Sequence, residues 1–334
     1  MPLRSVEPII TRQALTRVSL AYRNVNFVAD KLFPIIEGAN KETKVLKYNK
    51  APWFRDEAGV RSEGGVAPRA DMTVTSVDFD PINYSISTAI TDELREQSKI
   101  MGNLPVQPEI DAQIFMANKL DLKKEVRASS ILHSTNWSSV GVGGEDAAGA
   151  WGHATAANDT FLADMRTGHD TIINNTGYKP NKLFLSYHAA SKLRIAPALL
   201  AYIYPQGFTP SMFVSAAQLA VLADVEEVII GSAIKNTDEE TVADSSSTMV
   251  QVWGTSGSET KGVGFLFYAP STPRTLEPSA GYQYRKTQSN GLGRKGTEWR
   301  EPERHQDAYD MQEDTDIAAT GTDLGYMWKD TATT

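Results

Sequence analysis

The chain has 334 residues, of which 41% are hydrophobic and 22% charged, with a formal net charge of −8 at pH 7. This is ordinary for a folded protein of one large or two smaller domains, and the negative charge argues against a protein that coats nucleic acid with its whole surface. The absence of cysteine excludes disulfides, thiol nucleophiles and cysteine metal sites, and no segment approaches about 18 consecutive apolar residues, so no membrane partner is expected.

The N-terminal segment is predicted to be an arm that lies on another part of the structure. It is mildly basic, and a short helix is expected near residues 11–21. The apolar run FVADKLFP then ends at Pro34. The pattern is too brief to form a domain of its own.

Two predicted strands flank a long polar excursion. TKVLKYNK (43–50) indicates a modest strand, and VDFDPINYSISTAI (77–90) alternates with the period of a half-buried strand. Between them, residues 53–71 open on an aromatic pair and carry three arginines, four acids and three glycines. Long unstructured loops are uncommon in compact domains and are usually functional or disordered. We therefore expect a long hairpin whose tip reaches beyond its own core.

Residues 109–133 are predicted to form a long helix that packs on one side only. Pro105 and Pro108 suit a helix start, and Phe115, Leu122 and Val126 recur at helical spacing as its expected apolar side. The Gly-rich residues 137–157 then indicate a loop and a boundary.

Residues 158–270 are predicted to form a compact α/β unit with a central sheet. Its first helix would be capped by Asn158 or Asp159 and end at Gly177. This helix carries an apolar stripe of Phe161, Met165, Gly168 and Ile172.

The rest of this unit alternates strands and helices. The strand NKLFLS precedes a helix interrupted at Pro197, and Thr209-Pro210 is expected to open a helix that runs to Ala223. VEEVIIGSAI, TMVQVWG and VGFLFYAP read as three further strands, with an exposed acidic loop, NTDEETVADSSS, between the first two. Residues 275–334 are strand-like and rich in loops.

The sequence contains only weak indications of a catalytic, cofactor-binding or nucleic-acid-binding site. GLGRKG at 291–296 has the letters of a dinucleotide fingerprint, but no apolar strand precedes it and no helix is expected after it. YQYRKTQSNGLGRK (282–295) interleaves basic and aromatic residues as nucleic-acid platforms do, although an ordinary exposed hairpin explains it better. No metal-binding histidine spacing, nucleophile elbow or P-loop occurs. We therefore expect no cofactor, no metal and no enzymatic activity, and a chain built to bind copies of itself.

The order of these elements resembles the major capsid proteins of tailed bacteriophages, with the fold named after the Hong Kong phage. FVADKLFP looks like the end of that family's arm, YNKAPWFRDEAGVRSEGGVAPR like its extended loop, and residues 109–133 like its spine helix. GYKPNKLFLSYHAASKLRIAP, VEEVIIGSAIKNT and VQVWG resemble the axial domain, and DAYDMQEDTDIAATGTDLGY the last strands. The resemblance covers essentially the whole chain.

The resemblance implies an α+β fold with five segments. They are an N-terminal arm (1–42), an extended β-hairpin loop (43–90), a peripheral domain with the spine helix (91–136), an α/β axial domain (137–274) and the C-terminal strands of the peripheral domain (275–334).

The resemblance also implies the function. The chain would form hexamers and pentamers that close into an icosahedral virion capsid around double-stranded DNA, assembled in the host cytoplasm. Its expected partners are further copies of itself, a separate scaffolding protein, a portal, decoration proteins and nonspecifically packaged DNA. The alternatives are an encapsulin-type compartment of the same fold, an enzyme with a dispersed site in 158–270, and a tail or adhesin component.

The extended loop would then reach across a neighbouring subunit. Trp53 and Phe54 are the expected anchors, because aromatic residues and arginine are enriched at interfaces. Arginines of the loop would pair with a neighbour's acids, for which the acid-rich residues 301–316 are the candidates. The predicted interface set is Trp53, Phe54, Arg55, Glu57, Arg61, Glu63 and Arg69.

The arm is the candidate for the inner face, because attraction to phosphates requires local positive charge even on an acidic protein. The predicted DNA contacts are Arg4, Arg12, Arg17 and Arg23.

The sequence departs from the family in two respects that bear on assembly. Residues 53–71 contain no lysine, so we expect no covalent crosslinking through this loop. The arm begins almost at Met1, so any scaffold is expected to be a separate protein.

Overall fold

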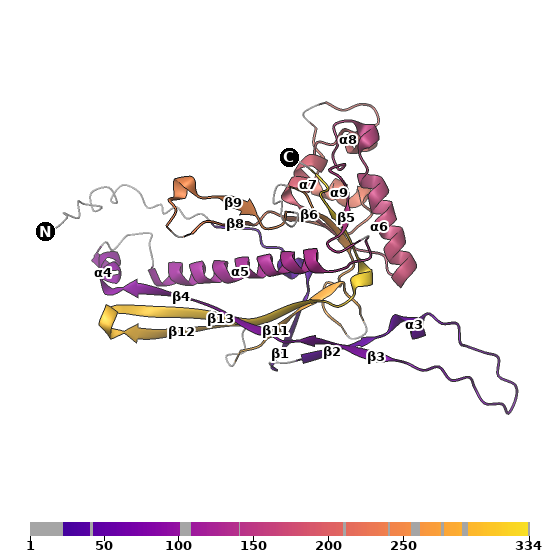
Figure 1. Ribbon diagram of the computed structural model, residues 1–334, viewed down its shortest axis with the longest axis horizontal. Helices are drawn as coiled ribbons and strands as arrows, with labels where there is room; N and C mark the ends of the chain where they lie inside the picture. The colour runs from indigo at the N-terminus through magenta and orange to yellow at the C-terminus, as the bar shows by residue number, and fades with distance from the viewer. Residues whose placement is uncertain are drawn as a thin grey trace.

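The computed structural model describes residues 23–40, 43–100, 108–139, 141–209, 212–239, 241–254, 261–274, 277–288 and 293–332. An elongated sheet with a long helix along it carries an α/β unit at one end, and a hairpin projects from the same end (Figure 1). The predicted helix near 11–21, together with Arg4, Arg12 and Arg17, lies outside the described residues.

The elongated part is built on a five-stranded sheet, called here the peripheral sheet. Its central strand is β13 (Gln306–Ala319), which pairs antiparallel with β4 (Ile82–Thr91) along one edge. Along the other edge, β13 pairs first with β12 (Arg294–Glu301) and then with β11 (Gly281–Lys286). β1 (Ile35–Gly38) adds a parallel strand to β11, and the short helix η3 (Pro302–Arg304) connects β12 to β13.

Two helices accompany the peripheral sheet: α4 (Asp92–Ile100) and the long α5 (Pro108–Ser134), which runs along it (Figure 1). The predicted helix over 109–133 is confirmed. The row of α5 that is buried repeats every four residues, through Met116, Leu120, Lys124, Ala128 and Leu132.

The expected apolar side of α5 was partly wrong. Phe115 is 50% exposed, while Leu122 and Val126 are half-buried. The row that packs inward begins one residue later, at Met116, so Phe115 points to the outside.

The α/β unit contains a second five-stranded sheet, called here the axial sheet. Its strands are ordered β5 (Glu145–Asp146), β14 (Gly325–Lys329), β10 (Gly264–Phe267), β6 (Lys182–Ser186) and β7 (Glu227–Gly231). Successive side chains point to opposite faces of a strand. Phe184, Phe265 and Met327 thus pack toward α5, whereas Leu266 and Trp328 pack on the opposite face.

Four helices supply the core on that opposite face: α6 (Phe161–Thr176), α7 (Tyr187–Leu193), α8 (Pro197–Ile203) and α9 (Ala216–Leu222). The single turn η1 (Ala156–Asn158) precedes α6. The predicted α6 stripe is buried, and Gly177 ends the helix in the left-handed region with a φ of 72°.

The other helix boundaries follow local signals. The chain breaks between α7 and α8 at Pro197, as expected. The predicted start of α9 at Pro210 was wrong: the helix begins at Ala216, because the Ser215 hydroxyl and the Gln218 side chain form a reciprocal capping box.

The expected central sheet also needs a correction. Among the described strands, β8 (Ile234–Asn236) and β9 (Met249–Gln251) pair only with each other and form a separate ribbon. The short helix η2 (Asp244–Ser246) lies in the acidic loop between them.

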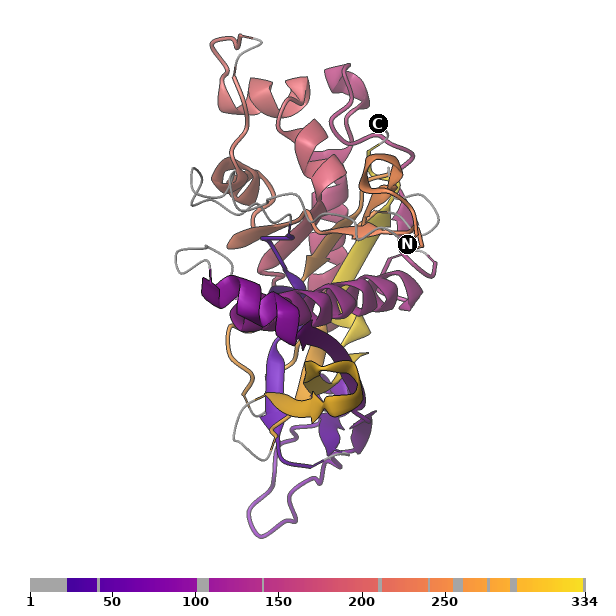
Figure 2. The ribbon, with the colours of Figure 1, turned by 90° about the vertical axis from the view of Figure 1, so that its left-hand side faces the viewer.

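The hairpin consists of β2 (Thr43–Tyr48), the short helix α3 (Lys50–Trp53), residues 54–73 and β3 (Val74–Phe79). β2 and β3 pair antiparallel. Residues 54–73, called here the tip, are all described and contain no helix or strand. The tip extends away from both sheets (Figures 1 and 2).

Two predicted boundaries differ from the structure. The hairpin ends at Phe79 and not at residue 90, because β4 leaves it to pair with β13. The C-terminal segment 275–334 does not stay in the peripheral part: after η4 (Thr322–Leu324), β14 returns to the axial sheet. Both differences arise because strands pair with segments that are distant in the sequence.

Candidate functional site

The root of the hairpin is fixed to the rest of the subunit. Val45 and Val77 pack against a buried cluster that includes Phe79 and Tyr284. Lys47 Nζ donates to the carbonyl of Thr320 at 2.6 Å. These contacts hold the ribbon against the peripheral sheet and leave the tip unsupported.

A second set of contacts joins α3 to the axial unit. The ammonium group of Lys50 forms an ion pair with Asp323 in η4 and donates to the carbonyl of Asn175 at 3.3 Å. The ring of Phe54 lies beside Gly177, where a Cβ atom would be 3.7 Å from Cε1 of the ring. The hairpin therefore has one fixed end and a defined direction.

The predicted aromatic anchors lie at the surface where the root meets the tip: Trp53 ends α3 and Phe54 begins the tip. Trp53 is 57% exposed and meets Tyr48 edge-on, with ring centroids 6.2 Å apart, and Phe54 is 65% exposed. Two large aromatic rings that remain this exposed on a rigid root are suited to bury more surface against another molecule.

The tip itself makes few contacts with its own subunit. Arg55 pairs with Glu57 at 3.3 Å, whereas Arg61, Glu63 and Arg69 are exposed and have no ion-pair partner within the described ranges. Val60 is fully exposed and Val66 is 87% exposed. The tip thus combines free charges with exposed apolar side chains, which suits an interface better than a free loop.

Three of the seven acids in 301–316, the expected partners of the tip arginines, are engaged within the subunit by cations outside this segment. Asp307 pairs with Arg95 at 2.5 Å and with Arg300 at 3.0 Å. Glu313 pairs with Arg294 at 2.8 Å, and further along β13 Asp314 lies 3.6 Å from Lys286. Glu303 and Asp310 form no ion pair among the described residues, so pairing of a neighbour's tip with acids of 301–316 stays a prediction.

The basic and aromatic residues of 282–295 are also turned inward. Tyr282 and Tyr284 are only 6% and 1% exposed, and Arg285 pairs with Glu37 in β1. In the described residues of 282–288 and 293–295, neither the nucleic-acid platform nor the exposed hairpin is present, because β11 and β12 each pair with β13. The strand β12 begins at Arg294, inside the fingerprint at 291–296, and continues beyond it, so a strand stands where a dinucleotide site requires a helix.

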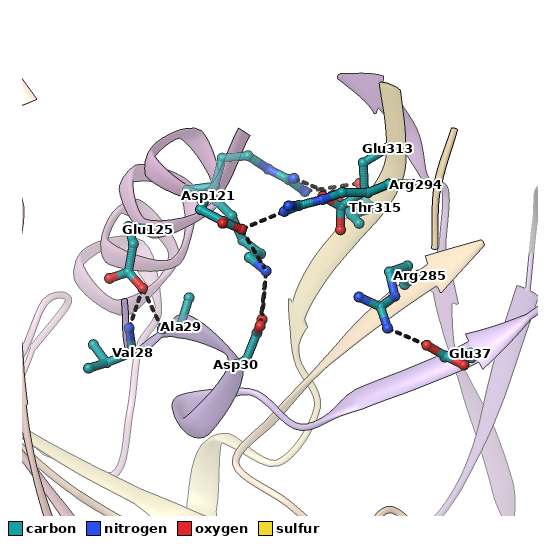
Figure 3. Close-up of polar contacts among 12 residues, drawn as sticks. Val28, Ala29, Asp30, Glu37, Asp121, Glu125, Arg285, Arg294, Glu313 and Thr315 are labelled. Atoms are coloured by element: carbon teal, nitrogen blue, oxygen red, sulfur yellow. Dashed lines mark hydrogen bonds and ion pairs between the residues drawn. The ribbon is translucent and has the colours of Figure 1, made fainter. Parts of the chain in front are cut away.

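A polar network joins α5 to the N-terminal and C-terminal segments (Figure 3). The amine of Lys124, only 6% exposed, lies 2.9 Å from Asp30 and 3.6 Å from Asp121. Asp121 in turn forms an ion pair with Arg294, and Arg294 forms a second ion pair with Glu313 on β13. Each buried charge in this chain of contacts has an opposite charge beside it, as burial requires.

Arg127 strengthens the same junction. Its guanidinium donates to the hydroxyl and the carbonyl oxygen of Thr315, at 2.8 and 3.0 Å. It also lies 4.2 Å from the ring centroid of Tyr84 on β4. One side chain of α5 thus contacts both β13 and β4.

Glu125 is the most buried charged residue of α5, with 0% exposure. One carboxylate oxygen accepts from the amides of Val28 and Ala29, at 2.5 and 2.6 Å, and the other accepts from Trp253 Nε1 at 2.6 Å. Burial raises the pKa of Glu125 to about 7 against the stabilising effect of these donors. Nothing in the local sequence predicted this contact, since its partners lie 96 and 97 residues before Glu125 and 128 residues after it.

The described residues include no group of three or more His, Cys, Asp or Glu side chains placed to hold a metal ion. In the same part of the chain, no helix combines the length and the apolar character that crossing a membrane would take.

A peripheral sheet with a long helix, an axial α/β unit and a projecting hairpin together define a phage-capsid type of fold. No family model matches the sequence. A curated relative, the major capsid protein of Burkholderia phage BcepMu, is 23% identical over 297 residues, which cover 85% of this chain and 84% of the relative.

Solved structures agree with this fold. A phage-related protein from Bordetella bronchiseptica RB50 superposes with a TM-score of 0.65 at 21% identity, over 93% of this chain and 94% of that one. The capsid structure of the cyanophage P-SCSP1u gives a TM-score of 0.57 at 10% identity, over 93% and 90%. The predicted α+β fold and the resemblance to tailed-phage major capsid proteins are confirmed.

Proposed function

We propose that this chain is a major capsid protein, which assembles with copies of itself into the shell of a tailed-phage virion. The observation that carries the proposal is the whole-chain likeness, at 85% coverage or more, to a relative named as a major capsid protein and to a phage capsid structure. The exposed root and tip of the hairpin support it from the physical side.

The finer features of the assembly are part of the proposal. The subunits form hexamers and pentamers, which close an icosahedral shell in the host cytoplasm. The hairpin of one subunit lies on its neighbour, with Trp53 and Phe54 as anchors and Arg55, Glu57, Arg61, Glu63 and Arg69 around them. A single exposed ion pair contributes only about 0–1 kcal/mol, so the stability of the shell comes from repeating the contact around closed symmetry.

The proposed contents and partners follow from the resemblance to tailed-phage major capsid proteins and, for the DNA contacts, from the positive charge of the arm. The shell encloses double-stranded DNA, held nonspecifically through phosphates by Arg4, Arg12, Arg17 and Arg23. Scaffolding, portal and decoration proteins are separate chains. The contacts between subunits are noncovalent, because residues 53–71 contain no lysine, and a ladder of covalent multimers on a denaturing gel would contradict this.

Negative-stain electron microscopy together with sedimentation of the purified protein tests the proposal. Closed polyhedral shells or flat hexameric sheets are expected. A protein that remains monomeric at high concentration, with every candidate scaffold added, would contradict the proposal and return attention to a dispersed enzyme site in 158–270. DNA rather than protein cargo inside the shells separates a virion from an encapsulin-type compartment.

A further inference from the structure

The β8–β9 ribbon stands apart from both sheets and has an outer edge along β8 (Figure 1). The backbone bonds that join Ala233 and Thr237 to the other strand face into the ribbon. Because these bonds alternate along an antiparallel pair, the peptide groups of Ile234 and Asn236 face outward. Among the described residues, no strand pairs with this outer edge. A strand edge of this kind can accept a further strand.

Asn24 already binds to this edge. Its side-chain amide brackets the outward peptide group of Ile234: Oδ1 accepts from the backbone amide at 3.1 Å, and Nδ2 donates to the carbonyl at 2.8 Å. Asn26 Nδ2 donates to the carbonyl of Ile230, before β8 begins, at 3.1 Å. Toward the N-terminus the chain therefore advances along β8 in the antiparallel direction, and the next outward peptide group is that of Asn236.

The direction of the arm is defined because its root is fixed. Val28 and Ala29, which lead into the single-turn helix α2 (Ala29–Leu32), are buried, and their amides donate to Glu125. The six residues 17–22, which lie outside the described part of the chain, span about 20 Å when they are extended. This length is enough to run along β8 and reach the acidic loop that follows it.

The sequence RVSLAYR of the arm suits this edge. Its large apolar residues stand at every second position, as in a strand with one apolar face: Val18, Leu20 and Tyr22. In the antiparallel register that begins at Asn24, these three fall on the face of the ribbon that carries Ile234 and Met249. The side chains of Ile234 and Met249 are 39% and 56% exposed, so an added strand would place apolar side chains beside them.

Charge favours the far end of the same register. The acidic loop, residues 236–247, contains four acids and no lysine or arginine. Glu239 in this loop is exposed and forms no ion pair among the described residues. Arg17 falls beside the loop, whereas Arg23 falls beside Lys235 of β8, and like charges directly opposite are unfavourable. The electrostatic attraction therefore acts through Arg17.

We propose that residues 17–23 of the arm add to the outer edge of β8 as a third, antiparallel strand, and that the acidic loop attracts Arg17. The occupant is the arm of the same chain, because Asn24 is bound at the start of this edge. The contact lies within one subunit and does not rest on the proposed shell. The helix expected near residues 11–21 overlaps the added strand, so only one of the two can form. Docking would also compete with DNA for Arg17.

Disulfide formation tests the register. The chain contains no cysteine, so a variant with two cysteines reports on one contact. Ala21→Cys with Thr237→Cys forms a directly opposed pair on the added strand and β8, about 5 Å apart. The matched control is Ala21→Cys with Thr248→Cys, since Thr248 lies across the ribbon from Thr237 and is one strand further away, at about 10 Å. Both threonines are exposed.

The rate of closure is measured with oxidised glutathione on the full chain, at a protein concentration too low for assembly, by gels run without reductant. We expect the Ala21/Thr237 pair to close inside one chain at least about tenfold faster than the Ala21/Thr248 pair, because a disulfide requires Cβ atoms that lie close together.

The role of charge is tested in the Ala21/Thr237 background. Glu239→Gln with Glu240→Gln should slow closure several-fold, because the loop then attracts Arg17 less strongly. The matched control is Glu93→Gln with Glu96→Gln, which removes two exposed acids from α4 and should leave the rate unchanged.

Three results would overturn this assignment of the edge. Equal rates for the two cysteine pairs would show that the arm does not lie along β8. Disulfide-linked dimers in place of the internal crosslink would assign the edge to the arm of another copy. Equal rates after the two glutamine substitutions in the loop and the two in α4 would remove the attraction by the acidic loop. Shell formation can fail or succeed independently of all three.

Discussion

Lys50, at the root of the hairpin, forms an ion pair with Asp323, which lies 273 residues further along the chain. The same amine donates to Asn175 at the end of α6. The pair joins the hairpin to the axial unit at the place where the tip begins to project. Because both side chains are about half exposed, the pair contributes little to stability, and its main effect is on the direction of the hairpin.

We therefore expect Lys50→Met to lower the free energy of unfolding by no more than about 1 kcal/mol while it clearly slows or prevents shell formation. Urea unfolding and sedimentation measure the two effects separately. The matched control is Lys44→Met, which removes an exposed ion pair to Asp78 within the same ribbon. Equal assembly by the two variants would show that the Lys50 contact does not orient the hairpin.

The aromatic anchors give a second prediction. Replacing Trp53 and Phe54 by alanine should leave the subunit folded, since both rings are more than half exposed. Loss of two anchors at an interface costs roughly 2 kcal/mol or more, so the protein concentration needed for assembly should rise at least about tenfold. Light scattering across a concentration series measures it, with Ser62→Ala in the tip as the control. Assembly at the wild-type concentration would exclude the pair as anchors.

The basic arm gives a third prediction. Neutralising it should reduce the DNA content of purified shells and weaken the dependence of DNA retention on salt, because each lost phosphate contact lowers the salt slope. The variant carries glutamine at Arg4, Arg12, Arg17 and Arg23. A control with the same charge change carries glutamine at the exposed residues Lys44, Lys123, Arg166 and Arg194. If both variants packaged DNA equally, the arm would not be the DNA-contacting face.

Local patterns in the sequence predicted most of the secondary structure. The long helix, the α6 stripe with its Gly177 terminus and the break at Pro197 were predicted from spacing and capping residues alone. The start of α9 was misplaced, because Pro210 was taken as the stronger signal and the Ser215–Gln218 capping box was overlooked. That signal was present in the sequence.

Contacts between segments that lie far apart in the chain could not be predicted from local sequence patterns. β13 pairs with the distant β4 and with β11 and β12, which precede it closely in the chain. Because β11 and β12 pair with β13, they do not form the expected exposed hairpin within the described part of 282–295. Three acids of 301–316 that looked free in the sequence, Asp307, Glu313 and Asp314, are engaged by Arg95, Arg294, Arg300 and Lys286. For the same reason, the burial of Glu125 could not be predicted from the sequence of α5. The hairpin and its exposed tip were predictable, because a long polar excursion between strands requires no knowledge of distant pairing.

The central claim is that the hairpin ties subunits together in a closed shell, and deleting residues 56–68 tests it most directly. The deletion removes most of the tip and leaves β2, α3 and β3 in place. Electron microscopy of the deleted chain beside the wild type, with circular dichroism to establish folding, is the measurement. We predict a folded subunit with wild-type helix content that forms no closed shells. Normal shells from the deleted chain would contradict the claim.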